Sequence, residues 1–421
     1  MGYAILALMV VGVVLMLTRV LPTAFALALL ALGIAILAGA PLTGDENSIL
    51  TTVLQTGSAA LAATMIAVLL GSWLGTLMDD TGIAATLVRR IVEFGGERPS
   101  VVALGVFAVS ILCGSITGSA PAAMLAGVVG IPAMIAVGVN PVVAGGTVLM
   151  GVGAGSPLEL PVWQFLSDAL GAPVDEVRTV MIRLFPFALV AGIAYVLVET
   201  RRRGARHAWA VRAPVRGRRG TAPWYALLTP IVPIVLALGF SVPIVPSLLV
   251  GVVFALVTTT RPGTYGERAL RSLYRAFDTA GPPIVLFIAI GMLLAAVKLP
   301  GAESALTPIV SAVSPGNAVL FAVVFAILVP LCLFRGPLNV FGLGAGVAGV
   351  LVSGGIYPLP AVVGLMASYN QVFGVSDPTS TQTVWAAQYA GVRPERAMVS
   401  TLPYTWVVGA AGIVLTAILY L

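Results

Sequence analysis

Long apolar segments separated by short polar stretches constrain this chain more than any other feature of its sequence. Several of them reach the roughly 20 residues that a helix needs to cross about 30 Å of hydrocarbon, and together they predict about ten to twelve crossings. Hydrophobic residues make up 59% of the chain and charged residues 9%, a balance that indicates lipid as the main solvent. We therefore expect an all-α polytopic membrane protein. The segments are Tyr3–Gly39, Ile49–Leu77, Val101–Leu112, Leu184–Val198, Tyr225–Val257, Ile284–Val297, Ala318–Leu333 and Met398–Leu421.

The amino-terminal segment is not typical of a cleaved signal peptide, and the cysteines do not indicate a disulfide or a metal site. Residues 1–18 carry no basic stretch and no cleavage site of small residues, so we expect them to be retained as part of a span. Cys113 and Cys332 are the only cysteines, and each sits in an apolar segment without a partner pattern. They are expected to be small buried hydrophobes, with neither a disulfide nor a metal site.

The positive charges gather in two short segments, which predicts the orientation of the chain. The linker 201–222 holds a run of arginines with no acid between them, and the segment 261–280 holds Arg261, Arg268, Arg271 and Arg275. Short basic loops favour the cytoplasmic side, so both are predicted to be cytoplasmic, in a bacterial inner membrane. The apolar stretch between the two basic segments must then cross the membrane and return to the cytoplasmic side, with its turn near Pro243–Pro246. The net charge is +6, but the basic residues lie in loops beside the membrane spans, so no nucleic-acid partner is predicted. The only histidine, His207, lies in the first linker.

An internal repeat is visible across the basic linker. Glycines, prolines and tryptophans recur in the same order at separations of roughly 220 residues. The tryptophans carry the most weight, because they are few whereas Gly and Pro are common. We therefore predict two repeats, 1–200 and 223–421, joined by the linker 201–222. The pairs are Gly71 with Gly291, Gly114 with Gly336, Pro141 with Pro360, Pro157 with Pro378, Trp163 with Trp385, and Gly171 with Gly391.

Each predicted repeat contains a segment rich in Gly, Ser and Pro, followed by a span that Pro interrupts. The first kind, 114–140 and 336–358, is predicted to form re-entrant hairpins, and the second, 141–165 and 360–385, broken helices. Paired breaks at membrane depth are tolerated where protein or a water-filled cavity takes up the freed backbone groups, and they indicate the binding site of a secondary transporter. Close helix packing on small residues is the alternative explanation of the glycines. Amphipathic pieces precede the hairpins at Ile83–Phe94 and Gly301–Val313.

Polar side chains inside apolar segments are costly in a bilayer, so they are functional candidates. In the first repeat they cluster at the predicted hairpin tip and at the helix break. Hydroxyls and N–H groups at a glycine turn favour an anion, helped by the positive ends of half-helices. The alternative is that each hydroxyl bonds a carbonyl of its own helix. The candidates for substrate binding are Ser115, Thr117, Ser119, Gly155 and Ser156.

The second repeat adds a cation and several amides. Arg335 follows an apolar run and presents a planar fork of donors, so it is predicted to clamp a substrate carboxylate. The alternative is a snorkelling or positive-inside arginine at the end of a span. The other substrate-binding candidates here are Asn339, Asn370, Thr379, Ser380 and Thr381.

A coupling ion would need a titratable carboxyl group or a set of oxygen ligands. A carboxyl group at low dielectric can carry a proton, and a carboxylate beside hydroxyls and unwound carbonyls can bind Na⁺. Asp79 and Asp80 end a span and are interpreted as caps of the helix that begins near Ile83. No cofactor is predicted. The ion-coupling candidates are Glu159, Gln371, Ser376 and Asp377, with Na⁺ placed at Ser115, Ser156 or Asp377.

The chain resembles the ion-transporter superfamily, which includes gluconate permeases, citrate and C4-dicarboxylate carriers, and the large membrane subunit of TRAP transporters. The resemblance rests on TRVLPTAFALALLALGIAILAG, GSWLGTLMDDTGIAATLVRRIVEFGGERP, CGSITGSAPAAM and NPVVAGGTVLMGVGAGSPLELP, and it covers nearly the whole chain. The first two are most similar to the gluconate permease and TRAP branches. The paired Ser-Asn-Thr signatures of the sodium-dicarboxylate branch are missing.

The resemblance implies two inverted repeats, each with a re-entrant hairpin and a discontinuous helix, on a homodimeric scaffold with elevator-like movement. The implied hairpin tips are Ser115–Ser119 and Gly336–Asn339. The implied breaks centre on Gly155–Pro157 and Ser376–Pro378.

These observations predict a secondary transporter of a small organic anion, such as a hydroxy- or dicarboxylate or a sugar acid, coupled to H⁺ or Na⁺. A Na⁺/H⁺ antiporter of the same fold and the membrane subunit of a TRAP-type system are the alternatives, followed by a channel or a membrane enzyme. No HExxH, GxSxG or GxxxxGK[ST] motif is present, and a single histidine removes most metal-ligand schemes, so no enzyme is predicted. The expected partners are the anion, the bilayer and a second copy of the chain.

Overall fold

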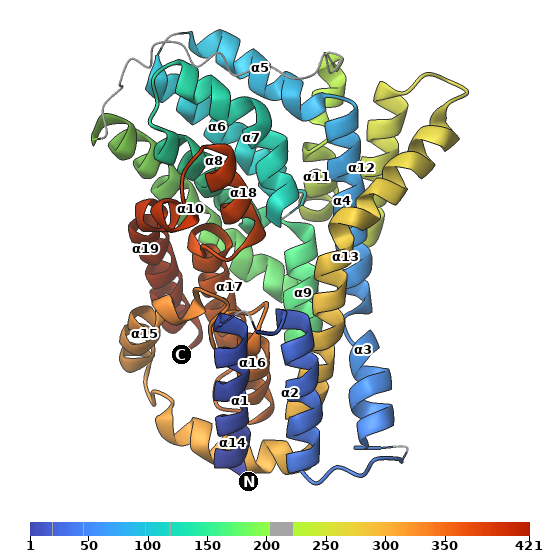
Figure 1. Ribbon diagram of the computed structural model, residues 1–421, viewed down its shortest axis with the longest axis vertical. Coiled ribbons are helices and arrows are strands. Elements are labelled where there is room, and N and C mark those ends of the chain that lie inside the picture. The colour runs from blue at the N-terminus through green and yellow to red at the C-terminus, as the bar shows by residue number, and fades with distance from the viewer. Residues whose placement is uncertain (19, 45, 97, 118, 203–221) are drawn as a thin grey trace.

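The computed structural model describes residues 1–18, 20–44, 46–96, 98–117, 119–202 and 222–421, and every regular element in these ranges is a helix (Figure 1). The elements before the linker are α1 (Gly2–Leu17), α2 (Thr23–Leu37), η1 (Ile49–Thr56), α3 (Gly57–Ala59), α4 (Ala62–Asp80), α5 (Ile83–Gly95), α6 (Pro99–Gly114), α7 (Ser119–Ala136), α8 (Pro141–Gly155), η2 (Ser156–Leu158), α9 (Leu160–Leu170) and α10 (Val174–Arg202). Those after it are η3 (Trp224–Leu228), α11 (Ile231–Gly239), α12 (Ile244–Thr259), α13 (Tyr265–Val297), α14 (Pro300–Val313), α15 (Ala318–Ile327), η4 (Val329–Cys332), α16 (Leu343–Ser353), α17 (Leu359–Ser376), α18 (Thr381–Tyr389) and α19 (Pro394–Tyr420). Most of the predicted linker, and His207, lie outside the described residues.

Helix lengths confirm a polytopic membrane protein. Within the described residues, five helices are long and apolar enough to cross a membrane, and α14 with α15, bent by 97°, would make a sixth. Six more apolar helices are only 10–17 residues long. An apolar helix of that length can form half of a re-entrant hairpin as well as a tilted crossing, so the predicted total of crossings stays a prediction.

The predicted reversal between the two basic segments is confirmed, and the amino-terminal apolar segment reverses as well. The segment from Tyr3 to Gly39 forms two separate helices, α1 and α2, which pack on each other. The stretch Tyr225–Val257 folds back on itself as α11 and α12, and Pro243 is the residue before the second helix. Proline suits this position because a helix start leaves its first N–H groups unpaired in any case.

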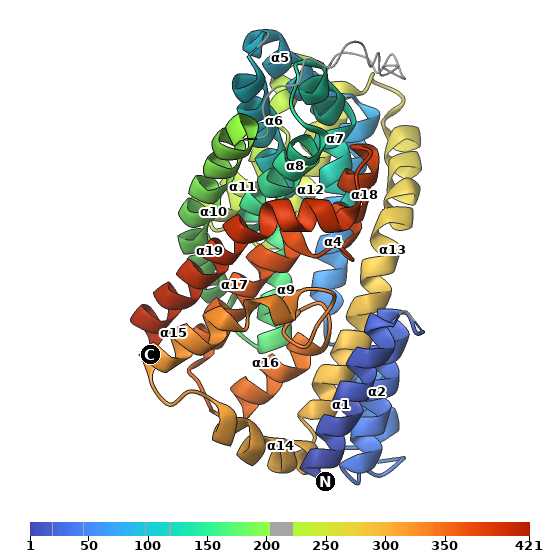
Figure 2. The ribbon, with the colours of Figure 1, turned by 60° about the vertical axis from the view of Figure 1, so that its left-hand side comes forward.

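The two amphipathic pieces form helices at opposite ends of the molecule. One is α5 and the other is α14, and both views place them at the two extremes of the long axis (Figures 1 and 2). Their mixed faces suit a border between apolar packing and water.

The predicted hairpin segments contain more helix than the sequence indicated. The first one, 114–140, is mostly helical, because α7 is an 18-residue helix with Pro132 inside it. Among the described residues of this segment, only 115–117 and 137–140 lie between helices, and α7 itself is rich in Ala, the best helix former. The helix before it, α6, packs on α7 and is the first arm of this hairpin.

The second hairpin differs in the same way. Its arms are α15 with η4 on one side and α16 on the other, and residues 333–342 form its tip. The first arm therefore precedes the predicted start at Gly336. Sequence reasoning missed both first arms because they are as apolar as a full span.

The predicted basic loop 261–280 is mostly helical. The helix α13 begins at Tyr265 and runs to Val297, with Pro282 and Pro283 inside it, so only residues 261–264 connect it to α12. In its charged first turns, Glu267 and Arg271 form an exposed (i, i+4) ion pair. Near its middle it packs on α4, and further on against α2 and α16.

The same order of elements occurs on both sides of the linker. The run α8, η2, α9 and α10 corresponds to α17, a short non-helical stretch, α18 and α19. The predicted pair of glycines follows this order, because Gly171 (φ 72°) ends α9 and Gly391 (φ 71°) comes just after α18. Glycine adopts this left-handed conformation without the steric cost that other residues meet.

Candidate functional site: a central cavity between two helix breaks

Both predicted helix breaks exist. At the first, Glu159 is extended (φ −79°, ψ 109°) between η2 and α9, and the indole N–H of Trp163 donates to the carbonyl of Pro157 at 2.9 Å. At the second, Asp377 is extended (φ −72°, ψ 114°) after α17, and the Ser380 hydroxyl caps α18. These breaks free backbone groups in the interior of the molecule, as the sequence predicted.

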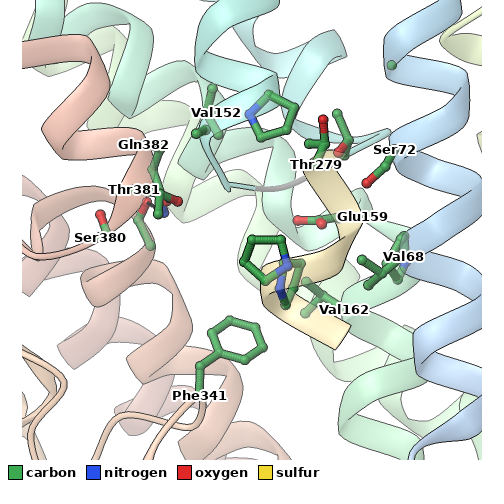
Figure 3. A pocket seen from close by; sticks show the side chains of 18 of the residues that line it. Val68, Ser72, Val152, Glu159, Val162, Thr279, Phe341, Ser380, Thr381 and Gln382 are labelled. Atoms are coloured by element: carbon green, nitrogen blue, oxygen red, sulfur yellow. Dashed lines mark hydrogen bonds between the residues drawn. The ribbon is translucent and has the colours of Figure 1, made fainter. Parts of the chain in front are cut away.

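A cavity of about 580 Å³ joins the two breaks to α4, α13 and both hairpin tips. Figure 3 shows Ser380, Thr381 and Gln382 on one side of it and Ser72 of α4 on the other, with Glu159 between them. The size suits a small organic molecule. Its polar lining residues are Ser72, Thr76, Asp79, Thr117, Ser156, Glu159, Arg275, Asp278, Thr279, Arg335, Asn339, Asn370, Asp377, Ser380, Thr381 and Gln382.

Asp377 links the second break to the second hairpin tip. Its Oδ2 accepts the backbone N–H of Arg335 at 3.2 Å. Its Oδ1 accepts the N–H and the hydroxyl of Thr379 at 2.8 and 2.7 Å. The side chain is 1% exposed, so all of these contacts are shielded from water. A buried carboxylate with several donors fixes the geometry of both segments.

Arg335 presents its side chain to the cavity from an unusual backbone. Both Phe334 and Arg335 have φ of 54°, a left-handed conformation that costs non-glycine residues free energy. Within the described residues, the Arg335 guanidinium has no hydrogen-bond or ion-pair partner, so its fork of donors is available to a ligand. The neighbouring Asn339 is tied up inside the tip, because its amide donates to the carbonyl of Cys332 and accepts the N–H of Phe341.

One hydrogen bond joins the two broken helices directly. The amide of Asn370, on α17, donates to the Ser156 hydroxyl at 2.9 Å, and both residues line the cavity. Glu159 is 6% exposed and also lines the cavity. Two residues that are more than 200 positions apart in sequence thus meet at the site.

Several predicted site residues face elsewhere. The Ser115 hydroxyl donates to the carbonyl of Leu112 in its own helix, which was the alternative interpretation. Ser376 exchanges hydrogen bonds with Thr401 and Thr405 of α19 and does not line the cavity. Thr379 contacts Asp377 and is outside the cavity lining as well.

Two further predicted residues place no polar side-chain atom in the cavity wall. Gln371 is 2% exposed, its Nε2 has no partner in the described part of the chain, and it is not in the cavity wall. Gly155 packs so closely on the first hairpin that an added Cβ would lie 2.3 Å from the Ile111 carbonyl oxygen, which is the small-residue packing of the alternative explanation. The side chain of Ser119 lies outside the described residues.

The structure adds cavity residues that sequence reasoning set aside. Asp79 at the end of α4 lines the cavity, as do Asp278 and Thr279 of α13. The interpretation of Asp79 and Asp80 as helix caps was wrong, because Gly82 precedes α5 and no side chain caps it, while Asp80 forms an ion pair with Arg275. The signal that could have found them is two adjacent acids at the end of an apolar span.

The described residues contain no group of three or more His, Cys, Asp or Glu side chains that could hold a metal ion. Oxygen ligands for a small cation are still present at the breaks, at Ser156 and Glu159. At Asp377 both carboxylate oxygens already accept hydrogen bonds, from the N–H groups of Arg335 and Thr379, and Oδ2 keeps a lone pair for a further partner.

A multi-pass helical protein with two discontinuous helices at an internal cavity belongs to the class of secondary transporters. The chain belongs to the family of the tripartite ATP-independent periplasmic transporter, DctM component, whose family model matches residues 8–421. This confirms the resemblance to the TRAP large membrane subunit, and it confirms that the chain is a transporter component and not an enzyme. No curated protein matches the sequence.

Among solved structures, the fold is similar to that of the YdaH transporter of Alcanivorax borkumensis. The TM-score is 0.66, and the match covers 94% of this chain and 98% of that chain. At 16% identity the likeness concerns the fold alone.

Proposed function

We propose that this chain moves a small organic anion across the inner membrane, with H⁺ or Na⁺ as the coupling ion. The observation that carries the proposal is the uncommitted Arg335 guanidinium in a cavity of about 580 Å³, which the joined residues Ser156 and Asn370 also line. A guanidinium fork binds a carboxylate with two parallel hydrogen bonds. Ser and Asn side chains then satisfy the hydroxyls of a hydroxy- or dicarboxylate or a sugar acid.

The proposed mechanism is an elevator-type movement of one part of the molecule past the other. The two hairpins and the two broken helices line the cavity together with α4 and α13, and Figure 3 shows Ser380, Thr381 and Gln382 across from Ser72 of α4. Two inverted repeats, 1–200 and 223–421, are supported by the matching order of elements and by α5 and α14 lying at opposite ends (Figure 2). Inversion places equivalent elements on opposite sides of a membrane.

Glu159 and Asp377 are the proposed ion-coupling groups, one at each break. Glu159 lines the cavity with little exposure, which suits a group that exchanges a proton or a cation with the substrate site. Asp377 holds the second hairpin tip through the Arg335 N–H. An ion bound there would therefore act on the same loop that presents the substrate-binding arginine.

The proposed partners follow from the family. A tripartite system supplies substrate through a soluble binding protein, and the chain would act beside that protein and a smaller membrane subunit. We also propose a homodimer, with the linker 201–222 and the segment 261–280 on the cytoplasmic side. The described end of α10 and the start of α13 lie toward the same end of the molecule, which supports a common side (Figures 1 and 2).

Uptake by proteoliposomes tests the proposal. Labelled succinate, citrate, gluconate and lactate are offered under a Na⁺ or a pH gradient, with and without the binding protein and the small subunit. We expect uptake of one class of anion, and a loss of more than about tenfold in Arg335→Gln, because hydrogen bonds between charged partners contribute about 1.5–3 kcal/mol. The matched control is Arg396→Gln, an exposed arginine on α19. Absence of anion uptake in every combination would refute the proposal.

A further inference from the structure

A second cavity, which we call the arginine cleft, lies beside the central cavity where α12 ends and α13 begins. It has a volume of about 610 Å³, and every residue that lines it is polar or charged. Four guanidinium groups face two carboxylates there, so the cleft has an excess of positive charge. Its lining residues are Asp80, Thr259, Arg261, Thr264, Glu267, Arg268, Arg271 and Arg275.

The four arginines differ in how strongly their guanidinium groups are already held by hydrogen bonds or ion pairs. Arg268 donates to the carbonyl of Thr259 at 3.1 Å, and Arg275 pairs with Asp80. Arg271 pairs with Glu267 at 2.6 Å, but both side chains are about 70% exposed, and such a surface pair contributes little free energy. Arg261 has no side-chain partner among the described residues. Two guanidinium groups can therefore turn to an incoming anion at small cost.

Exposed apolar faces run along both helices toward the arginine cleft. On α12 the face consists of Val250, Val253 and Val257, which are 46%, 56% and 59% exposed. On α13 it includes Tyr274 and Phe277, at 64% and 48%. In Figure 1 these two helices form an arm that projects from the rest of the molecule. In a bilayer such faces contact acyl chains, with aromatic rings near the headgroups.

We propose that the arginine cleft binds the phosphate of an acidic phospholipid, whose acyl chains lie on the apolar faces of α12 and α13. Guanidinium forks bind phosphate oxygens in pairs, and basic clusters at the ends of spans attract anionic lipids. The inference rests on the membrane-embedded fold and not on the proposed substrate. Arg275 lines both the cleft and the central cavity, so a bound headgroup reaches the wall of the transport site.

Thermal unfolding of the purified chain in neutral detergent tests this site. Phosphatidylglycerol should raise the apparent unfolding temperature in a saturable way, because it binds the folded state, whereas phosphatidylcholine should not. In the double variant Arg261→Gln with Arg271→Gln, the apparent affinity for phosphatidylglycerol should fall by about tenfold or more. The matched control, Arg393→Gln with Arg396→Gln, removes the same charge from exposed positions at the start of α19 and should bind as the parent does.

A variant that is expected to bind lipid more tightly distinguishes a specific change in lipid binding from misfolding of the arginine cleft. Glu267→Gln removes the carboxylate that occupies Arg271 and should tighten phosphatidylglycerol binding, which a misfolded cleft would not do. If the double variant unfolds without lipid, Arg261→Gln alone gives the same comparison, since the Arg261 side chain has no hydrogen-bond or ion-pair partner in the part of the chain that the structure describes.

Three results would overturn the proposal. The first is an equal shift with inorganic phosphate at the same concentration, which would assign the site to free phosphate. The second is an equal loss of affinity in the control pair, which would indicate only a diffuse charge effect. The third is the absence of a shift with phosphatidylglycerol in the parent protein.

Discussion

At the first helix break the chain is held by backbone packing, whereas at the second a buried carboxylate holds it. An added Cβ at Gly155 would collide with the Ile111 carbonyl, and one at Gly114 would lie 2.4 Å from the carbonyl oxygen of Val152, so the first hairpin and α8 touch through their main chains. At the second break Asp377 spans the gap to the hairpin tip with its side chain. A backbone contact is fixed by shape, while a carboxylate contact depends on charge. A proton or cation at Asp377 would therefore act directly on the contact that holds the second break.

The largest expected effect is at Asp377. Asp377→Ala leaves the N–H groups of Arg335 and Thr379 without their acceptor, at a cost of about 3 kcal/mol for buried groups of this kind. We expect transport to fall by about 100-fold. Asp377→Asn keeps one acceptor oxygen and should retain part of the activity. Uptake in proteoliposomes measures both, and parental uptake by the alanine variant would show that the carboxylate does not hold the tip.

The next effect tests the backbone contact at the first break. Gly155→Ala forces a methyl group against backbone atoms, so we expect a loss of about 2 kcal/mol in stability. Gly281→Ala on α13 is the control, because a Cβ there meets nothing within 4 Å and alanine favours the helix by about 0.5–1 kcal/mol. Thermal unfolding compares them. Equal unfolding temperatures would mean that the first break is not packed as described.

A smaller effect concerns the hydrogen bond that joins the breaks. Ser156→Ala removes the acceptor of the Asn370 amide and should cost about 1 kcal/mol. A double-mutant cycle with Asn370→Ala, read as uptake rate or stability, should show coupling of similar size. Additive effects would indicate that the two broken helices act independently.

The smallest effect separates the two hydroxyls of the first hairpin tip. Ser115→Ala should leave substrate affinity within about twofold of the parent, because its hydroxyl bonds its own helix. Thr117→Val, which alters the cavity lining, should weaken binding more. Substrate-dependent thermal shifts compare them, and a stronger effect at Ser115 would reverse the assignment.

The sequence predicted the breaks well because each combines a proline with polar residues inside an apolar span. Such residues are costly in contact with lipid, so within a span they are expected where the helix is broken inside the protein. It could not predict which hydroxyls face the cavity. Ser376 and Ser156 lie near the ends of α17 and α8 but are one position apart in the register that pairs Pro157 with Pro378. Ser376 contacts α19 and Ser156 lines the cavity, because one residue along a helix turns a side chain by about 100°, and the residue types alone do not show this. The wall formed by α13 was missed for another reason. Its charges indicated a basic loop, whereas helix formation carries Asp278 and Thr279 to the cavity.

The paired prolines of α13 give this wall a property that its side chains alone do not have. Pro282 and Pro283 carry no N–H, so the carbonyls of Asp278 and Thr279 receive no helical hydrogen bond from them. All four residues line the central cavity. This side of the cavity thus offers two successive backbone acceptors for water or for a hydrated cation. A solute that crosses this cavity would meet backbone carbonyl acceptors on α13, even where the neighbouring side chains are apolar.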